Sequence, residues 1–149
     1  MSLLVDANLL VYAASPRSPH HPATARWLTA RLEDPDVRVG FCWSVLYTFT
    51  RLASSRRVMG DAVVPVSEAW AVAQRFLQGS ARIVDAGPRH SAIASQLSTV
   101  AGLTSNDVPD MQLAALAVEH GLTLCSHDRG FARFPGLSWQ DPLDPGRDD

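Results

Sequence analysis

Residues 108–128 read VPDMQLAALAVEHGLTLCSHD, and this stretch decides the fold. Pro109 stands in the first turn of a predicted helix, apolar residues then recur at helical spacing, and Gly121 is placed to end the helix. Residues 122–125 are a short apolar run typical of a buried strand, and Asp128 follows closely. The stretch therefore predicts a helix that leads into a strand, as in α/β folds.

The N-terminal end also combines an apolar strand with an acid. Residues 2–5 form a predicted strand that runs into Asp6, and Asn8 could cap a helix that continues to residue 13. Further helices are predicted over residues 22–32, 44–54, 67–77 and 88–100, and further strands over residues 37–41 and 82–84. This alternation predicts an α/β fold with a largely parallel sheet.

Length and composition suit one domain. The chain has 149 residues and 46% hydrophobic composition, so we expect a single domain over residues 1–140 and a disordered tail, rich in Pro, Gly and Asp, over residues 141–149. Cys42 and Cys125 lie in apolar stretches without metal-site spacing and are expected to be buried, reduced thiols. No signal peptide or membrane-length apolar run is evident, so we expect a cytoplasmic protein that does not contact membranes.

The charged residues exclude several classes of protein. A net charge of −2 gives no general attraction to nucleic acid, so any RNA contact has to be local. All 13 basic residues are arginine. The absence of lysine argues against receiver-type signalling domains and haloacid-dehalogenase-like phosphatases, which are known for a lysine in the active site, and it excludes a P-loop.

Three aspartates are candidates for catalysis. Asp6 and Asp128 each follow a predicted strand, and ligands of open parallel sheets bind beyond the carboxyl ends of the strands. Asp110 would join them if its helix starts near that edge. Carboxylates about 4 Å apart repel by roughly 4 kcal/mol at an effective dielectric constant near 20, so a cation or protons must compensate. Oxygen-only ligands suit Mg²⁺ or Mn²⁺, and metal-assisted phosphodiester hydrolysis is the corresponding reaction.

Each acid also has a purely structural interpretation. Asp6 could cap the next helix, Asp110 could be favoured by the helix dipole, and Asp128 could begin a turn with Gly130. Asp107 is better explained as a cap than as a metal ligand.

Longer strings of residues resemble a known family. Residues 3–13 (LLVDANLLVYA) resemble the opening of PIN domains of the VapC family. Residues 108–121 and 126–137 (SHDRGFARFPGL) resemble the closing half of a VapC subgroup abundant in mycobacteria, and residues 49–52 extend the resemblance over nearly the whole chain. The resemblance implies a PIN-like three-layer sandwich with a central, mostly parallel sheet of about four to five strands flanked by helices.

The resemblance also implies a function and a set of site residues. VapC proteins are toxins of toxin–antitoxin pairs that cleave RNA with Mg²⁺ or Mn²⁺ and are restrained by a small cognate antitoxin; a homodimer is also implied. The metal-binding and catalytic acids of the family fall on Asp6, Asp110 and Asp128. Asn8 and the hydroxyl of Ser126 match supporting positions.

The chain departs from the family pattern at two positions. Many PIN domains place a glutamate where this chain has Thr48, and often another aspartate where it has Gly130. Firm binding of a second metal is therefore doubtful. A catalytically impaired PIN scaffold that binds RNA or protein is the alternative function.

A group of arginines, Arg51, Arg56 and Arg57, lies around the end of the predicted helix over residues 44–54. Their guanidinium groups could bind RNA phosphates or the antitoxin through bidentate contacts, or pair with surface acids.

Overall fold

The computed structural model describes residues 1–146 and contains one five-stranded sheet with the strand order β3-β2-β1-β4-β5. Every neighbouring pair of strands is parallel. The strands are β1 (Ser2–Val5), β2 (Arg38–Phe41), β3 (Arg82–Ile83), β4 (Thr123–Cys125) and β5 (Ser138–Gln140). The predicted α/β class with a mostly parallel sheet of four to five strands is confirmed.

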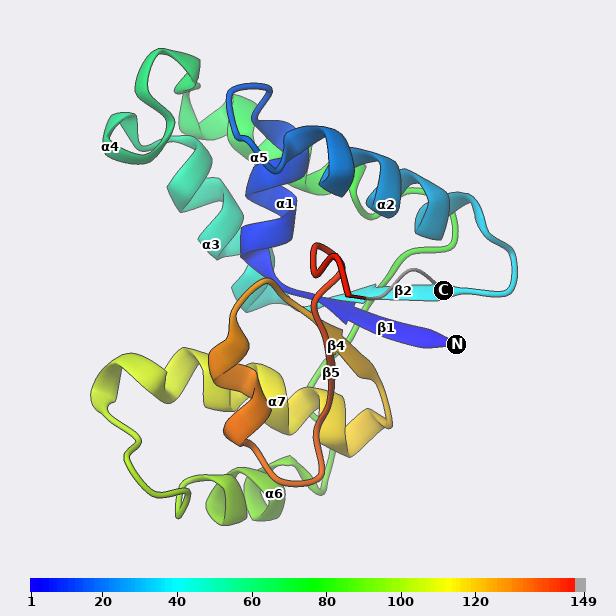
Figure 1. The fold of residues 1–149 in the computed structure, drawn as a ribbon, viewed down its shortest axis with the longest axis vertical. Helices are drawn as coiled ribbons and strands as arrows, with labels where there is room; N and C mark the ends of the chain where they lie inside the picture. The colour runs from blue at the N-terminus through cyan, green and yellow to red at the C-terminus, as the bar shows by residue number, and fades with distance from the viewer. Residues whose placement is uncertain (147–149) are drawn as a thin grey trace.

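Helices cover both sides of this sheet. The α-helices are α1 (Ala7–Ala14), α2 (His21–Glu33), α3 (Trp43–Ala53), α4 (Arg56–Met59), α5 (Val66–Arg75), α6 (His90–Leu97) and α7 (Val108–His120). Short 3₁₀ helices are η1 (Gly60–Ala62), η2 (Ser105–Asp107) and η3 (Arg129–Arg133). In Figure 1, α1 to α5 lie on one side of the sheet and α6 and α7 on the other, which gives three layers.

The register between the two central strands positions the site. Val5 of β1 is opposite Cys125 of β4, and the backbone N–H of Asp6 donates a hydrogen bond to the Cys125 carbonyl (3.0 Å). Both strands are almost completely buried at this end. The residues that follow them, Asp6 and Ser126, therefore emerge side by side at the carboxyl edge of the sheet.

Three local expectations differ from the structure. Asn8 is inside α1 and does not cap it; Asp6 is the cap, because its Oδ1 accepts a hydrogen bond from the backbone N–H of Ala7 (2.7 Å). No helix was predicted around Arg56, where the structure has the short helix α4, and β5 was not predicted. β5 is a three-residue edge strand, too short for a period-two pattern to distinguish it from a loop.

The end of the described chain contacts the rest of the domain. Asp141 is 7% exposed, and one of its oxygens lies 2.9 Å from Nδ1 of His127. Residues 141–146, which the sequence assigns to the tail, thus begin with an anchored residue. Residues 147–149 of the predicted tail lie outside the described residues, and the division into one domain and a tail stays a prediction.

Two further expectations can be compared with the structure. Cys42 and Cys125 are free and buried, as predicted. Among residues 1–146, the structure contains no helix with the length and apolar character needed to cross a membrane.

Candidate active site

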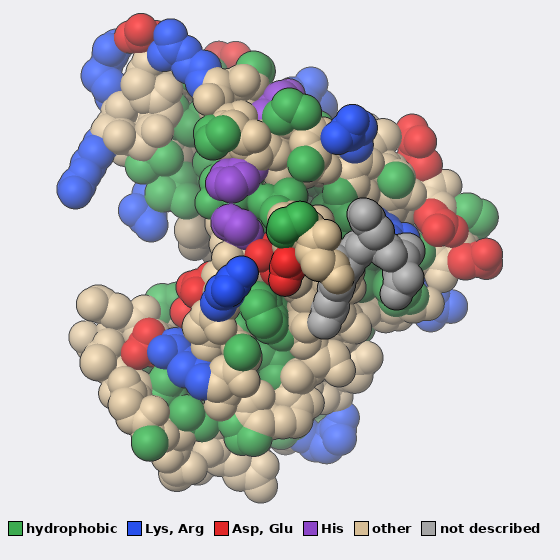
Figure 2. Space-filling view, in the orientation of Figure 1, with side chains coloured by type: hydrophobic (Ala, Val, Ile, Leu, Met, Phe, Trp, Pro, Cys, Tyr) green, Lys and Arg blue, Asp and Glu red, His purple; other side chains and the backbone are tan. Residues whose placement is uncertain are grey.

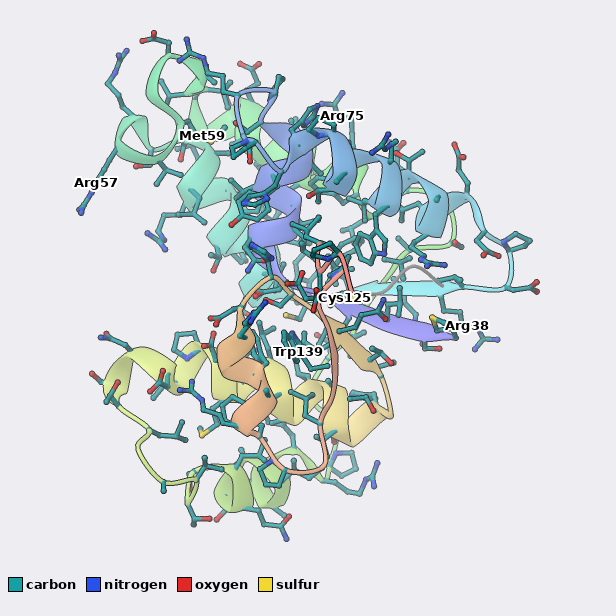
Figure 3. All side chains as sticks on the ribbon, viewed as in Figure 1. Arg38, Arg57, Met59, Arg75, Cys125 and Trp139 are labelled. Carbon is teal, nitrogen blue, oxygen red and sulfur yellow. The ribbon has the colours of Figure 1, made fainter. Side chains whose placement is uncertain are left out.

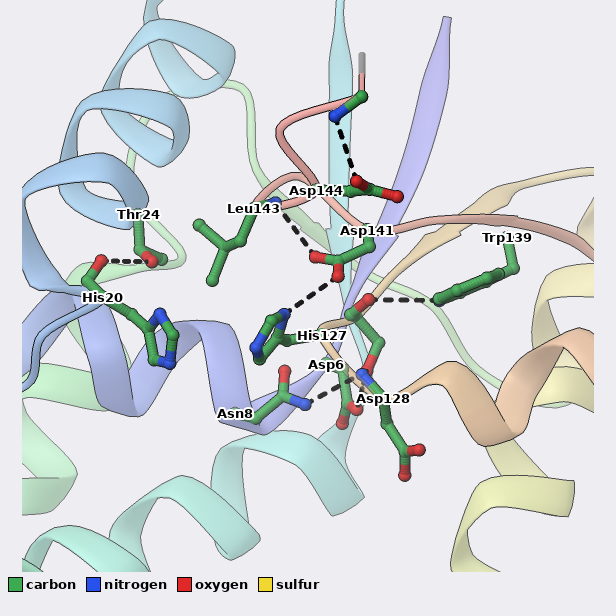
Figure 4. A network of polar contacts seen from close by, with 12 residues as sticks. Asp6, Asn8, His20, Thr24, His127, Asp128, Trp139, Asp141, Leu143 and Asp144 are labelled. Atoms are coloured by element: carbon green, nitrogen blue, oxygen red, sulfur yellow. Dashed lines mark hydrogen bonds and ion pairs between the residues drawn. The ribbon is translucent and has the colours of Figure 1, made fainter.

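One buried serine holds two of the predicted acids in place. The Ser126 hydroxyl donates a hydrogen bond to Oδ2 of Asp6 (2.7 Å), and it accepts one from the backbone N–H of Asp128 (3.1 Å). It also accepts a hydrogen bond from Nδ2 of Asn8 (3.1 Å), as can be followed in Figure 4. A hydroxyl has one donor and two acceptor positions, so Ser126 is fully used in joining β1, α1 and the segment after β4.

The third acid, Asp110, comes from a different element, helix α7. Asp110, in the first turn of α7, lines a hollow between α3 and α7 together with Asp6 and Thr48. Figure 2 shows a notch between the two helical halves, with acidic side chains at its inner end. The pKa of Asp110 is raised to about 6, because burial disfavours its charge and the negative charges of Asp128 and Asp6 repel it. The structure thus places Asp110 within electrostatic reach of the other two acids.

The pKa of Asp6 is also raised, and no positively charged residue is among the groups that shift it. Burial raises its pKa above the usual range, and the negative charge of Asp128 raises it further. The hydrogen bonds from Ser126 and Ala7 lower the pKa but do not cancel the effect of burial. A cation placed between Asp6 and Asp128 would favour the ionised form of both.

The donor atoms fit a hard, hydrated cation in an open site. Within residues 1–146, no three His, Cys, Asp or Glu side chains gather closely enough to form a complete metal cage. However, buried Oδ1 of Asn8, beside Ser126, has no hydrogen-bond partner among those residues. Buried oxygens are normally paired, and Mg²⁺ typically uses one or two carboxylates and keeps several waters. Asp6 and Asp128 fit that pattern better than they fit a closed zinc-like site, and Asn8 is joined to Asp6 through Ser126.

Thr48 lies where the missing glutamate was expected, on the wall of the same hollow as Asp6 and Asp110. One turn earlier on α3, Ser44 donates a hydrogen bond to Oε1 of Gln112 on α7 (2.7 Å). This bond joins the two walls of the hollow, so α3 and α7 are held together next to the acids.

The predicted arginine group lies away from the acids. Arg51 is exposed in the last turn of α3, and Arg56 and Arg57 are exposed on α4. Arg56 pairs with the exposed Asp61 (3.8 Å), and Arg57 extends outward at the tip of its half of the molecule (Figure 3). Among the described residues, no hydrogen bond or ion pair joins these arginines to the three acids.

The structural interpretations of the acids are also correct in part. Asp6 caps α1, and Oδ1 of Asp128 accepts a hydrogen bond from the backbone N–H of Gly130 (2.8 Å), which closes a turn. Asp107 forms a capping box with Thr104 at the start of η2. For Asp6 and Asp128, the structural role and the position in the site therefore coexist.

Two features of the site were not predicted. Arg133 of η3 reaches Asp107 (2.9 Å) and Asp110 (3.7 Å). His127, between Ser126 and Asp128, packs against His20 from the loop before α2, with ring centroids 4.8 Å apart and ring planes tilted by 57° (Figure 4). The arginine follows closely after Asp128 in the sequence and could have been suspected; no sequence signal brings His20 to this place.

Comparison with known families gives a direct match. The PIN-domain family profile matches residues 3–137. Ribonuclease VapC37 of Mycobacterium tuberculosis is 39% identical over 139 residues, covering 93% of this chain and 96% of the relative. Ribonuclease VapC43 of the same species is 39% identical over 143 residues, covering 95% and 96%.

Solved structures of low sequence identity share the fold. VapBC2 of Rickettsia felis, solved with a DNA fragment from its promoter, matches with a TM-score of 0.70 at 19% identity, covering 94% of this chain and 98% of the other. VapC20 of Mycobacterium tuberculosis, described as a toxin that cleaves the sarcin–ricin loop, matches with a TM-score of 0.65 at 19% identity, covering 91% and 98%.

Proposed function

This chain belongs to the PIN-domain family of VapC-type ribonucleases, and we propose that it cuts RNA internally with Mg²⁺ or Mn²⁺ bound near Asp6, Asp110 and Asp128. The relatives that it matches at 39% identity over almost their whole length are named ribonucleases. In this proposal the protein is the toxin of a VapBC-type pair. Its substrate and its free, buried cysteines suit the cytoplasm.

The observation that carries the proposal is that the Ser126 hydroxyl bonds both the Asp6 carboxylate and the backbone N–H of Asp128, while Asp110 lines the same hollow as Asp6. Ser126 orients Asp6 toward the edge of the sheet, and the turn at Gly130 orients Asp128. These hydrogen bonds within the protein would preorganise the acids for a cation and a phosphodiester.

The protein residues would divide the work as follows. Asp6 and Asp128 would hold the cation, with Asn8 Oδ1 contacting it or one of its waters. Bound Mg²⁺ or Mn²⁺ would lower the pKa of a water and neutralise charge on the leaving oxygen. Asp110, on the wall of the same hollow as Asp6, would be placed to accept a proton from the attacking water.

The structural relatives support one of the proposed partners, an antitoxin. VapBC2 of Rickettsia felis and VapBC-1 of Haemophilus influenzae are toxin–antitoxin pairs with this fold, which supports a small antitoxin as partner here. We propose in addition that the chain forms a homodimer. Arg51, Arg56 and Arg57 would contact RNA or the antitoxin outside the notch.

The test is cleavage of total bacterial RNA by the purified chain with Mg²⁺, with Mn²⁺ and with EDTA, followed by mapping of the new RNA ends. We expect discrete cuts that need the metal and disappear in Asp128→Asn. Asp36→Asn, an exposed aspartate before β2 at the opposite edge of the sheet, should cut normally. Cleavage that survives EDTA would exclude the metal mechanism.

The alternative, an impaired scaffold, makes a different prediction in the same experiment. It would bind RNA or an antitoxin without producing new RNA ends at any metal concentration. The observation in its favour is that Thr48 brings no charge to the hollow. Binding without cleavage by the unmodified chain would therefore replace the enzyme with this function.

A further inference from the structure

We propose that Arg133 is a positively charged residue of the active site that binds the RNA phosphate beside Asp110. Its guanidinium would supply positive charge that a second metal ion would otherwise supply. The inference rests on the proposed function. It goes further because it assigns substrate binding to a residue outside the acidic set. It also explains how the site could work with few carboxylates.

The position of Arg133 supports this role. Its Nη2 lies 2.9 Å from Oδ1 of Asp107 and 3.7 Å from Oδ2 of Asp110. The guanidinium also lies over the ring of Phe134, with Cζ 5.1 Å from the ring centroid, and Phe134 is buried. The two acidic contacts of Nη2 and the ring contact together hold the guanidinium beside Asp110. The side chain keeps 31% of its surface exposed, so a ligand can reach it.

The residue that orients Arg133 is itself firmly placed. Asp107 Oδ2 accepts hydrogen bonds from the backbone N–H and the hydroxyl of Thr104 (2.8 and 3.2 Å), while Oδ1 faces Arg133. These hydrogen bonds and the arginine lower the pKa of Asp107, so it stays ionised. Asp107 therefore acts as a fixed anchor for the guanidinium. Asp110 is a second, weaker partner at a longer distance.

The unused donors of Arg133 suit a phosphate. Both acidic contacts use Nη2, and among the described residues Nε and Nη1 make no hydrogen bond. A guanidinium presents five N–H donors in a planar fork that matches phosphate oxygens. Arg133 can therefore keep its anchor on Asp107 and still offer two nitrogens to a phosphodiester.

The charges of the surrounding residues favour the same conclusion. Thr48 and Gly130 bring no carboxylate to the site. A Cβ at Gly130 would lie 3.0 Å from Oδ1 of Asp128 and 3.9 Å from Cζ of Arg133, so the glycine leaves room between the acid and the guanidinium. A site with fewer negative charges and one fixed positive charge has less need of a second dication.

The test uses two binding measurements with opposite expected signs. Arg133→Ala should tighten the binding of Mn²⁺ alone about three- to tenfold, because a positive charge that repels the dication is removed. The same substitution, made in an Asp6→Asn background that does not cleave, should weaken the binding of a labelled 20-nucleotide single-stranded RNA about tenfold in metal-free buffer. Calorimetry gives the first affinity, and fluorescence anisotropy gives the second.

Two matched variants define the controls. Arg38→Ala removes the same charge from an exposed residue at the start of β2, on the opposite edge of the sheet, and should change neither affinity more than twofold. Arg133→Lys keeps the charge but loses the fork, so it should leave Mn²⁺ affinity unchanged and lose part of the RNA affinity. If Arg133→Ala does not fold, Arg133→Lys still tests the role of the fork.

Each remaining result overturns the inference. Unchanged RNA affinity in Arg133→Ala would show that the guanidinium does not contact phosphate. Weaker Mn²⁺ binding would show that Arg133 only holds Asp110 in position. Neither affinity depends on cleavage, so failure of the unmodified chain to cut RNA would refute the proposed function without deciding the role of Arg133.

Discussion

Replacing Asp110 by asparagine should stabilise the metal-free protein at neutral pH. The Asp110 side chain is 26% exposed, and burial together with the charges of Asp128 and Asp6 raises its pKa from 3.8 to about 6. The ionised carboxylate is therefore less stable in the folded than in the unfolded protein. Only Arg133, at 3.7 Å, opposes the effect among the groups that shift this pKa. Asparagine keeps the shape of the side chain and removes the charge.

The size and the pH range of the effect follow from the two pKa values. A difference of roughly 2 corresponds to about 3 kcal/mol, which solvent screening and the loss of the Arg133 pair reduce to about 1–2 kcal/mol. Well below pH 3.8 the carboxyl is protonated in both states and the charge has no influence. As the pH rises from about 4 to about 6 the folded state loses stability, because the unfolded carboxyl ionises before the folded one. At pH 7.5 the full difference between Asp110→Asn and the unmodified protein is expected.

The assay is urea unfolding in EDTA at pH 4, 5.5 and 7.5, with the free energy of unfolding compared between the two proteins at each pH. Asp36→Asn, at an exposed aspartate, should change the free energy by less than about 0.5 kcal/mol throughout. Adding Mn²⁺ should stabilise the unmodified protein more than the variant, because binding to the folded state adds stability. A variant that is less stable at pH 7.5, or a gain that does not depend on pH, would refute the electrostatic reasoning.

The remaining predictions concern the other residues of the site. Thr48→Glu should tighten Mn²⁺ binding and destabilise the metal-free protein; calorimetry and thermal melts that show neither change would mean that Thr48 does not face the acids. Asp6→Asn and Asp128→Asn should abolish RNA cleavage without lowering the melting temperature in EDTA, since asparagine can also cap a helix or turn; full activity in either would remove the site. Ser126→Ala should destabilise the protein by about 1–3 kcal/mol in urea unfolding, because buried polar partners lose their hydrogen bonds; a loss below about 0.5 kcal/mol would contradict that network.

Much of the fold could be predicted because periodic elements dominate it. Helices α2, α3, α5 and α7 lie within a few residues of their predicted ranges, since each carries a regular apolar face or a clear terminator such as Gly121. The helix predicted over residues 88–100 is shorter in the structure, as α6 covers His90–Leu97. β5 was missed because its pairing with β4 depends on the whole chain returning to the edge of the sheet, which no local pattern specifies.

The site could be predicted only as a set of residue types. The sequence places Asp6 and Asp128 after strands, but only the parallel register of β1 and β4 puts Asp6 and Ser126 side by side. The distance from Asp110 to the other acids depends on where α7 begins in space, which the spacing in the sequence does not define. Arg133 lies in the string that resembles the family, yet its contact with Asp107 bridges two segments 26 residues apart.

The structural and the catalytic interpretations of Asp6 are compatible because they use different lone pairs of its two oxygens. Oδ1 accepts a hydrogen bond from Ala7 at the start of α1, and Oδ2 accepts one from Ser126. Each carboxylate oxygen can accept a second interaction. Although both bonds favour the charged form, the pKa of Asp6 remains raised because burial and the charge of Asp128 outweigh them. Hydrogen bonds that suffice for a helix cap thus leave this carboxylate without full compensation, and a nearby cation is the group that would supply it.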